Sequence, residues 1–466
     1  MNAAPHAALF ERLAAILGPG GWTTDTDILA PHLVEWRGRY RGTTPFLAAP
    51  STTDEVAAVV RACAEARMPI TPQSGNTGLV GGQIPDGEVL LSLKRMNRIR
   101  AIDAADDSLV AEAGCILQTV QEAAQSVDRL FPLSLGSQGS AMIGGLISTN
   151  AGGVHVVRYG MMRDLVLGLE VVLPDGSILP GLKSLRKDNT GYDLRQVFIG
   201  AEGTLGVVTA ATLKLVPRPT QHVTAVVGLM SAEQALALLQ HAKAETGALA
   251  AFEIMNRLSV DVCVRHMPGV RDPFAMAPSF IALLEFESVR AEGLEAAVED
   301  LLGAALDEGL IIDAAVAKSG AQARDFWKLR EEIPAAHRLE GAQVNLDVSV
   351  PVSAVPTFLR KAEATVQAHC PGARVIAFGH AGDGNIHYTI LQPVDADPLT
   401  FPGAALVQSV QDDVAALGGS ISAEHGIGVA RRAELPRYKS PVALAAMRAL
   451  KDAFDPHRIM NPRAMI

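Results

Sequence analysis

Two histidines and a neighbouring Glu-His pair are the residues of this chain best suited to metal chemistry. His380 and His387 flank residues 381–385, which read AGDGN, and Glu424 and His425 follow in the run SAEHGIG. Glycine, Asp and Asn tolerate the positive φ of a tight turn, so we expect residues 381–385 to join two apolar strands, RVIAF and IHYTI, as a hairpin. Both imidazoles would then lie at one end of that hairpin.

These residue types predict a divalent-metal site with a base beside it. Two imidazoles and a carboxylate with open coordination positions suit Zn²⁺ or Mn²⁺. Glu424 and His425 are adjacent and should point in different directions, which favours one ligand and one non-ligand. We therefore predict that His380, His387 and Glu424 bind the metal and that His425 accepts a proton. The alternative is that these are ordinary surface or core histidines, since the chain has 12.

Three glycine-rich segments predict a site for a large anionic cofactor. They are residues 73–82 (QSGNTGLVGG), residues 136–153 (GSQGSAMIGGLISTNAGG) and a run that starts GAEGTLG at Gly200 and ends as a strand. Backbone amides of such loops can approach a pyrophosphate closely. The sequence shows neither GxGxxG after a strand nor a Walker motif, which disfavours a nicotinamide-binding Rossmann fold and a P-loop. Glycines spread across a domain fit an extended dinucleotide, although each segment alone could be a plain surface loop.

Composition excludes several classes of protein. A chain of 466 residues predicts two or three domains. Its 48% hydrophobic and 19% charged content is typical of a compact enzyme, and its net charge of −10 argues against nucleic-acid binding. No apolar run approaches the roughly 20 residues that span a bilayer. At the amino terminus Glu11 and Arg12 interrupt any signal-peptide core, and Leu9, Leu13 and Ile16 instead predict an amphipathic helix.

The four cysteines predict a reducing compartment. Cys63, Cys115, Cys263 and Cys370 are far apart and form no CxxC pair. This spacing argues against a disulfide framework and against an iron–sulfur cluster. We therefore expect a cytoplasmic enzyme without a transmembrane segment.

Six motifs, taken in order, resemble those of one enzyme family. They are PITPQSGNTGLVGG, GGLISTNAGG, RKDNTGYDLRQVFIGAEGTLGVVT, GHAGDGNIH, AEHGIG and KDAFDPHRIMNP, and the similarity extends from about residue 35 to Asn461. The chain resembles the flavin-dependent D-2-hydroxyacid dehydrogenases, which include D-lactate and D-2-hydroxyglutarate dehydrogenases and have the vanillyl-alcohol-oxidase type of FAD fold. The resemblance implies an α+β fold with a two-subdomain FAD-binding domain, an antiparallel-sheet substrate domain capped by helices and a C-terminal helical segment.

The resemblance also implies where each part of the chain belongs. Residues 1–45 would form an N-terminal helical segment, residues 46–217 the FAD-binding domain, residues 218–410 the substrate domain, and residues 411–466 a segment that closes the flavin site. The residues that the resemblance implies for FAD binding are Pro72, Ser74, Gly75, Asn76, Thr77, Gly78, Leu79, Gly82, Pro132, Ser137, Gly139, Ile143, Gly144, Gly145, Thr149, Gly153, Glu202, Gly203, Val208 and Asn461.

The same comparison predicts non-covalent FAD. Some members of the wider fold attach FAD through a His in the first glycine-rich loop, and residues 73–83 contain no His. His155 follows the second loop too late to replace it.

The resemblance implies that Arg330, in the run WKLR, contacts the substrate carboxylate. A guanidinium group can bind a carboxylate through two parallel hydrogen bonds, which fits this role. The alternative is a helix-surface Arg paired with Glu331 or Glu332, because residues 325–341 read as an amphipathic helix that stops at Pro334.

Two positions depart from the hydroxyglutarate dehydrogenases. This chain has Pro334 where those enzymes have Thr, and Asn345 in the strand VNLDVSVP where they have Lys. Two polar contacts to a diacid are thereby missing, which favours D-lactate or a larger apolar D-2-hydroxy acid.

The predicted reaction is oxidation of a D-2-hydroxy acid to the 2-oxo acid. The metal would lower the pKa of the 2-hydroxyl group, His425 would take its proton, and the C2 hydrogen would leave as hydride to the flavin N5. Asn385 is expected to shape the turn. Electrons would pass to an acceptor such as an electron-transfer flavoprotein or a quinone, and a homodimer is one expected assembly. The alternatives are an alcohol oxidase or flavin-using transferase of the same fold, or a flavoprotein subunit that only carries electrons.

Overall fold

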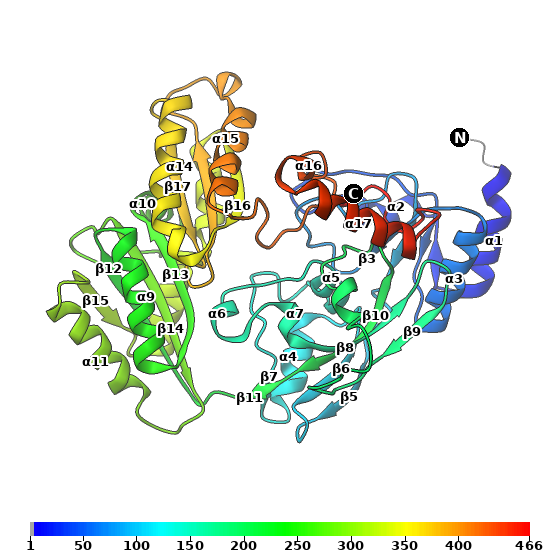
Figure 1. The fold of residues 1–466 in the computed structure, drawn as a ribbon, viewed down its shortest axis with the longest axis horizontal. Coiled ribbons are helices and arrows are strands. Elements are labelled where there is room, and N and C mark those ends of the chain that lie inside the picture. Colours follow the sequence, from blue (N-terminus) through cyan, green and yellow to red (C-terminus); the bar gives the residue numbers. More distant parts are fainter. Residues whose placement is uncertain (1–3) are drawn as a thin grey trace. The chain divides into compact units, whose positions relative to one another are not determined.

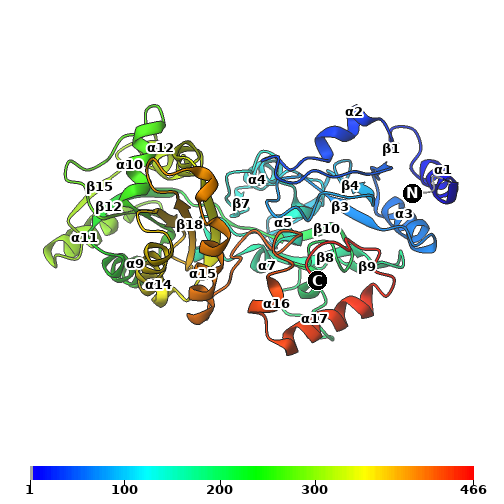
Figure 2. The ribbon, with the colours of Figure 1, turned by 90° about the horizontal axis from the view of Figure 1, so that it is seen from above.

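The computed structural model describes residues 4–466, which divide into two compact units (Figures 1 and 2). Unit 1 comprises the chain up to Gly152, Gly160–Arg218 and Glu424–Ile466. Unit 2 comprises Gly153–Tyr159 and Pro219–Ala423. The chain therefore enters unit 2 briefly, returns to unit 1, builds the rest of unit 2 and ends in unit 1.

Two sheets form the framework of unit 1. One is four-stranded, with the order β1-β2-β4-β3 and parallel pairing of β4 with both β2 and β3. The other is five-stranded and antiparallel, with the order β5-β6-β10-β8-β9. The strands of unit 1 are β1 (Trp22–Thr23), β2 (Leu47–Ala48), β3 (Ile70–Gln73), β4 (Val89–Ser92), β5 (Ile99–Asp103), β6 (Ser108–Glu112), β8 (Val166–Val172), β9 (Ile178–Gly181) and β10 (Val207–Lys214), with the separate pair β7 (Arg129–Leu130) and β11 (Val216–Pro217).

The helices of unit 1 pack on these sheets. Leu9 and Leu13 are buried and Ile16 packs against the same core, which confirms the predicted amphipathic helix. The side chain of Thr52 accepts from the backbone N–H of Glu55, so the predicted helix start is also confirmed. The helices are α1 (Ala4–Leu17), α2 (Thr26–Leu29), α3 (Thr53–Glu65), α4 (Leu117–Gln125), α5 (Ile143–Ser148), α7 (Met162–Leu165), α8 (Arg195–Phe198), α16 (Leu435–Tyr438) and α17 (Pro441–Phe454), with a 3-10 turn at Ala30–His32.

A seven-stranded antiparallel sheet forms the centre of unit 2. Its order is β15-β12-β14-β13-β17-β18-β16. Because side chains alternate between the faces of a strand, the sheet buries one apolar set against α9, α11, α14 and α15 and another against α10, α12 and α13. The strands are β12 (Gln221–Leu229), β13 (Leu249–Asn256), β14 (Phe280–Ser288), β15 (Asp313–Val316), β16 (Gln343–Ser349), β17 (Arg374–Gly379) and β18 (Asn385–Leu391).

The helices of unit 2 differ from the prediction at one place. The helix expected over residues 325–341 begins earlier and ends before Pro334, which lies in the first turn of the next helix, where a missing N–H is tolerated. The helices are α6 (Val156–Tyr159), α9 (Ala232–Thr246), α10 (Arg257–His266), α11 (Leu294–Asp307), α12 (Gly320–Glu331), α13 (Ile333–Ala336), α14 (Val355–His369) and α15 (Gly403–Ala416), with 3-10 turns at His337–Glu340, Val352–Ala354 and Pro398–Thr400.

Among residues 4–466, the structure contains no helix whose length and apolar character would let it cross a membrane. Cys63, Cys115, Cys263 and Cys370 are all buried free thiols.

Candidate active site

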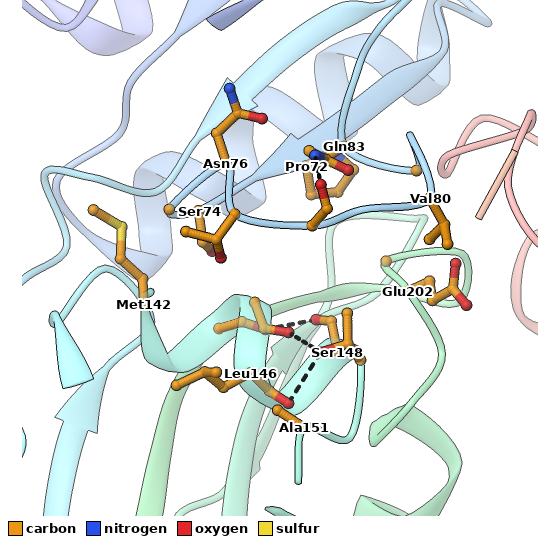
Figure 3. Close-up of a pocket in the computed structure, with 18 of the residues that line it drawn as sticks. Pro72, Ser74, Asn76, Val80, Gln83, Met142, Leu146, Ser148, Ala151 and Glu202 are labelled. Atoms are coloured by element: carbon orange, nitrogen blue, oxygen red, sulfur yellow. Dashed lines mark hydrogen bonds between the residues drawn. The ribbon is translucent and has the colours of Figure 1, made fainter. Parts of the chain in front are cut away.

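A cavity in unit 1 brings the three glycine-rich segments together. Figure 3 shows Ser74, Asn76 and Val80 on one side of it, Leu146 and Ser148 on the opposite side. Most residues expected to bind FAD line this cavity, namely Pro72, Ser74, Gly75, Asn76, Thr77, Gly78, Leu79, Gly82, Ser137, Gly144, Gly145, Thr149, Glu202, Gly203, Val208 and Asn461.

Four of the expected cofactor residues lie elsewhere. Pro132, Gly139 and Ile143 are not among the lining residues of the cavity, and Gly153 belongs to unit 2. Ile143 is fully buried at the start of α5 and is part of the hydrophobic core. The cavity also has lining residues that the sequence analysis did not name, namely Val80, Gln83, Leu93, Leu135, Gly136, Met142, Leu146, Ser148, Ala151, Gly152, Gly206 and Val207.

The first glycine-rich segment has a backbone that few residues could adopt. Asn76 has a φ of 55°, in the left-handed region that Asn tolerates. Its Nδ2 donates to the carbonyl oxygens of Pro31 at 3.2 Å and Val34 at 3.0 Å. A Cβ added at Gly75 would lie 2.3 Å from the carbonyl oxygen of Ser140, so this position requires glycine. The loop is therefore held close to the second glycine-rich segment.

Asn461 joins the first and third glycine-rich segments. Its Nδ2 donates to the carbonyl oxygens of Gly82 at 2.9 Å and Glu202 at 2.8 Å. Its backbone N–H donates to the carbonyl oxygen of Ile70 at 2.8 Å. Asn461 thus holds two of the glycine-rich segments together and also lines the cavity.

Glu202 holds the AEHGIG segment in place. Its carboxylate accepts from the backbone N–H groups of Ile427 and Gly428, each at 2.7 Å. Burial raises the pKa of the Glu202 carboxyl, and these two hydrogen bonds favour its charged form. Glu424 and His425 consequently line the same cavity as the glycine-rich segments. Glu202 lines the cavity, as the prediction of cofactor binding requires, and it also supports the loop that carries His425.

In unit 2 the predicted hairpin is confirmed. β17 pairs with β18 so that Phe378 lies opposite His387, and His380 follows the end of β17. Gly384 has a φ of 89°, which lets the chain reverse between the two strands. The His380 and His387 rings are nearly perpendicular, at 82°, with centroids 5.3 Å apart. The two imidazoles therefore converge at one end of the hairpin.

Glu253, on β13, is a buried carboxylate that the sequence analysis missed. Its Oε1 lies 2.5 Å from His380 Nδ1, and its Oε2 accepts from Arg330 Nε at 2.6 Å. Burial raises the pKa of this carboxyl, but the charges of His380 and Arg330 outweigh burial and lower the pKa to about 2. An ionised Glu253 accepts a hydrogen bond from His380 Nδ1–H. Nε2 is then the ring nitrogen that faces away from Glu253 and can bind a metal. The sequence does contain an indication of this residue, because Glu253 is the only charged residue in the apolar run LAAFEIMN, and a buried charge needs a partner.

The structure overturns the surface alternative for Arg330. This side chain is only 8% exposed and pairs with Glu253, not with Glu331 or Glu332. Its guanidinium carbon lies 4.6 Å from the ring centroid of Phe378. Arg330 donates to Glu253 through Nε, and this hydrogen bond fixes the orientation of the planar guanidinium group. The two Nη nitrogens lie at the end of the side chain, beyond Nε.

Asp347 supports the other side of the hairpin. Asn385 Nδ2 donates to Asp347 Oδ1 at 2.9 Å and to the carbonyl oxygen of Val348 at 3.0 Å, so Asn385 does fix the turn. His387 Nδ1 lies 3.6 Å from Asp347 Oδ1. The backbone N–H of Ala423 donates to the carbonyl oxygen of Asp347 at 3.2 Å. Asp347 therefore links β16 both to the turn of the hairpin and to Ala423, the last residue of unit 2.

The two departures lie on α13 and β16. Pro334 is in the first turn of α13 and has no polar side-chain atom. Asn345 is exposed on β16, and its Oδ1 accepts from the Thr389 hydroxyl at 2.7 Å. Neither Pro334 nor Asn345 has a positively charged side chain that could bind the second carboxylate of a diacid.

Comparison with known proteins gives family matches over most of the chain. Residues 44–180 match a model described as an FAD binding domain, and residues 218–465 match one described as FAD linked oxidases, C-terminal domain. The chain is 37% identical to D-2-hydroxyglutarate dehydrogenase of Stutzerimonas stutzeri, over 98% of each chain. It is also 37% identical to the mitochondrial D-2-hydroxyglutarate dehydrogenase of Danio rerio, over 99% of this chain and 87% of that one.

A solved structure supports the fold alone. p-Cresol methylhydroxylase has a TM-score of 0.78 over 99% of this chain and 97% of its own, with 16% sequence identity. The predicted α+β fold, with an FAD-binding domain and an antiparallel-sheet domain, is therefore confirmed.

Proposed function

The chain belongs to the FAD-linked oxidase family, and on that basis we propose that it oxidises a D-2-hydroxy acid to the 2-oxo acid with FAD as hydride acceptor. Its similarity to D-2-hydroxyglutarate dehydrogenases along nearly the whole chain supports this reaction class. The observation that carries the proposal is the buried Glu253, which holds a candidate metal ligand, His380, with one oxygen and a candidate substrate-binding group, Arg330, with the other.

The cavity of unit 1 fits FAD. Its lining is rich in glycine, so backbone N–H groups can approach a pyrophosphate. FAD bound here would supply the hydride acceptor at its N5 atom.

His380, His387 and Glu424 are proposed to hold a divalent ion, Zn²⁺ or Mn²⁺. Support comes from the convergence of the two rings and from the hydrogen bond that Glu253 makes with one of them. Such an ion acts as a Lewis acid that lowers the pKa of a bound hydroxyl group.

The chain's own residues supply the remaining steps of the proposal. His425 lines the cavity beside the glycine-rich segments and takes the proton of the substrate hydroxyl. Arg330 binds the substrate carboxylate through its Nη nitrogens and fixes which face of C2 meets the flavin. Electrons then leave to an acceptor that is not a nicotinamide. A screen of D- and L-2-hydroxy acids with a dye acceptor tests the proposal, and activity confined to L-isomers or to simple alcohols would contradict it.

The flavin should be released on denaturation. Residues 73–83 contain no His to form the covalent link, so heat or acid is expected to leave the yellow cofactor in the supernatant. Absorbance of the supernatant and of the dissolved pellet measures the two fractions. Flavin that stays with the precipitated protein would show a covalent bond.

Replacing Glu253 by Gln should weaken metal binding. A neutral amide cannot serve as a charged acceptor for both His380 and Arg330, and loss of such a supporting partner typically costs about 10- to 100-fold in metal affinity. Zn²⁺ titration of the flavin-loaded enzyme measures this change. The control is Glu363→Gln on the exposed side of α14. Equal Zn²⁺ affinity in both variants would remove Glu253 from the proposal.

Pro334 and Asn345 bear on substrate choice. A pocket without a cation discriminates less in favour of a dianion, so we expect activity on D-lactate or a larger apolar D-2-hydroxy acid to equal or exceed that on D-2-hydroxyglutarate. Asn345→Lys should move the ratio of kcat/KM values toward the diacid, with Asn345→Gln as a control of similar length. A tenfold preference of the wild-type enzyme for D-2-hydroxyglutarate would mean that another cation recognises the second carboxylate.

A further inference from the structure

Unit 2 contains a second cluster of potential metal ligands, separate from the hairpin histidines. It consists of His155, in the turn just before α6, and of Glu285 and Glu287 on β14, and its ligand atoms all lie within 4.8 Å of one another. Glu285 and Glu287 are two positions apart on one strand and so share a face of the sheet. His222, on β12, is the register partner of Glu287 and lies beside this group as a further imidazole. Every member belongs to unit 2.

Aromatic donors hold one oxygen of each carboxylate. Trp327 Nε1 donates to Glu285 Oε2 at 2.7 Å, and the Tyr159 hydroxyl donates to Glu287 Oε2 at 2.6 Å. Carboxylates that ligate metals are commonly hydrogen-bonded in this way by a second group, which fixes the orientation of the ligating oxygen. The pair is therefore oriented before any ion binds.

The other oxygen of each carboxylate faces an imidazole nitrogen. Glu285 Oε1 lies 3.1 Å from His155 Nε2, and Glu287 Oε1 lies 3.4 Å from His222 Nδ1. Two ligands at about 2.1 Å from one ion are at most about 4.2 Å apart. His155, Glu285 and Glu287 therefore need to move only slightly closer together to coordinate a metal, which would replace the contact between His155 Nε2 and Glu285 Oε1.

Burial and charge also favour a cation here. The Glu287 side chain is only 3% exposed, whereas that of His222 is 53% exposed. Two largely buried carboxylates carry two negative charges, and a divalent ion compensates both at once. The exposed His222 provides an entry path from solvent.

We propose that His155, Glu285 and Glu287 form a second divalent-metal site, of the Zn²⁺ class, in unit 2, with His222 as the outer partner that orients Glu287. Mixed imidazole and carboxylate ligands suit Zn²⁺ better than Ca²⁺ or Mg²⁺, which prefer oxygen ligands alone. The ion would connect the short stretch Gly153–Tyr159 to β14.

Zn²⁺ titration of the flavin-loaded enzyme, after dialysis against a chelator, tests this site. Bound Zn²⁺ per chain is compared in the wild type, in His155→Gln/Glu287→Gln, in His380→Ala/His387→Ala and in the combined variant. We expect the first double variant to lose one equivalent, and the second to retain one that the combined variant lacks. His241→Gln, at an exposed position on α9, is the control and should match the wild type.

The outcomes separate this inference from the proposed function. A His380→Ala/His387→Ala variant that binds no Zn²⁺, or a combined variant that still retains the ion, would overturn the second site. An unchanged count in His380→Ala/His387→Ala would instead contradict the hairpin site alone. Because the buried replacements could impair folding, His222→Asn at the exposed edge provides an independent measurement. It should weaken Zn²⁺ binding in the His380→Ala/His387→Ala background by at least about tenfold, the lower end of losses caused by outer partners of a ligand, and unchanged affinity would exclude His222.

Discussion

Loss of His380, His387 or Glu424 is expected to remove most turnover while FAD remains bound. Each Ala variant deletes one of three proposed ligands, and the glycine-rich segments that line the cofactor cavity are left intact. Without the ion the substrate hydroxyl keeps its ordinary high pKa, so proton removal at neutral pH becomes unfavourable. Flavin absorbance, bound metal and dye-coupled turnover measured on the same sample check the three parts of this prediction.

A matched control is available on the same fold. His369 lies at the exposed end of α14, and His369→Ala should keep both metal and activity. Fully active wild-type enzyme that contains no metal after chelation would show that His380, His387 and Glu424 do not act as a metal site.

His425→Ala is expected to keep metal and flavin but to lower kcat by about 10² to 10⁴, the usual contribution of a positioned base. The loop that carries His425 is held by Glu202 through the N–H groups of Ile427 and Gly428, so the substitution leaves the loop anchored. Steady-state kinetics combined with metal analysis separates this effect from ligand loss. His457→Ala, near the C-terminus at an exposed position, is the control.

The pH dependence offers a second readout for His425. The activity that remains in His425→Ala should rise with pH, because hydroxide then competes as the base. A loss of less than tenfold would assign proton removal to another group.

Features that depend on local pattern were predictable from the sequence. The turn at residues 381–385, the helix start at Thr52 and the core face of the first helix follow from the conformational preferences of a few adjacent residues. The family resemblance and the fold followed from six motifs in order, and the comparisons confirm both.

Features that depend on distant partners were not predictable. Glu253 contacts His380 from 127 positions away, and Glu202 contacts Ile427 from 225 positions away. No periodicity links such pairs, because they meet only when strands and loops from different parts of the chain are assembled. Arg330 shows the same limit: its helix looked amphipathic, but only the position of β13 decided that the guanidinium group is buried.

The carboxylate shared by Arg330 and His380 has a thermodynamic consequence. A substrate carboxylate bound to Arg330 competes with Glu253 for the positive charge of the guanidinium group. The negative charge of Glu253 is then less neutralised by Arg330 and acts more strongly on the His380 ring. An ion held by His380 would be favoured by the same change. Because such linkage is reciprocal, tighter metal binding in the presence of a 2-hydroxy acid must be matched by an equal gain in affinity for the acid in the presence of metal.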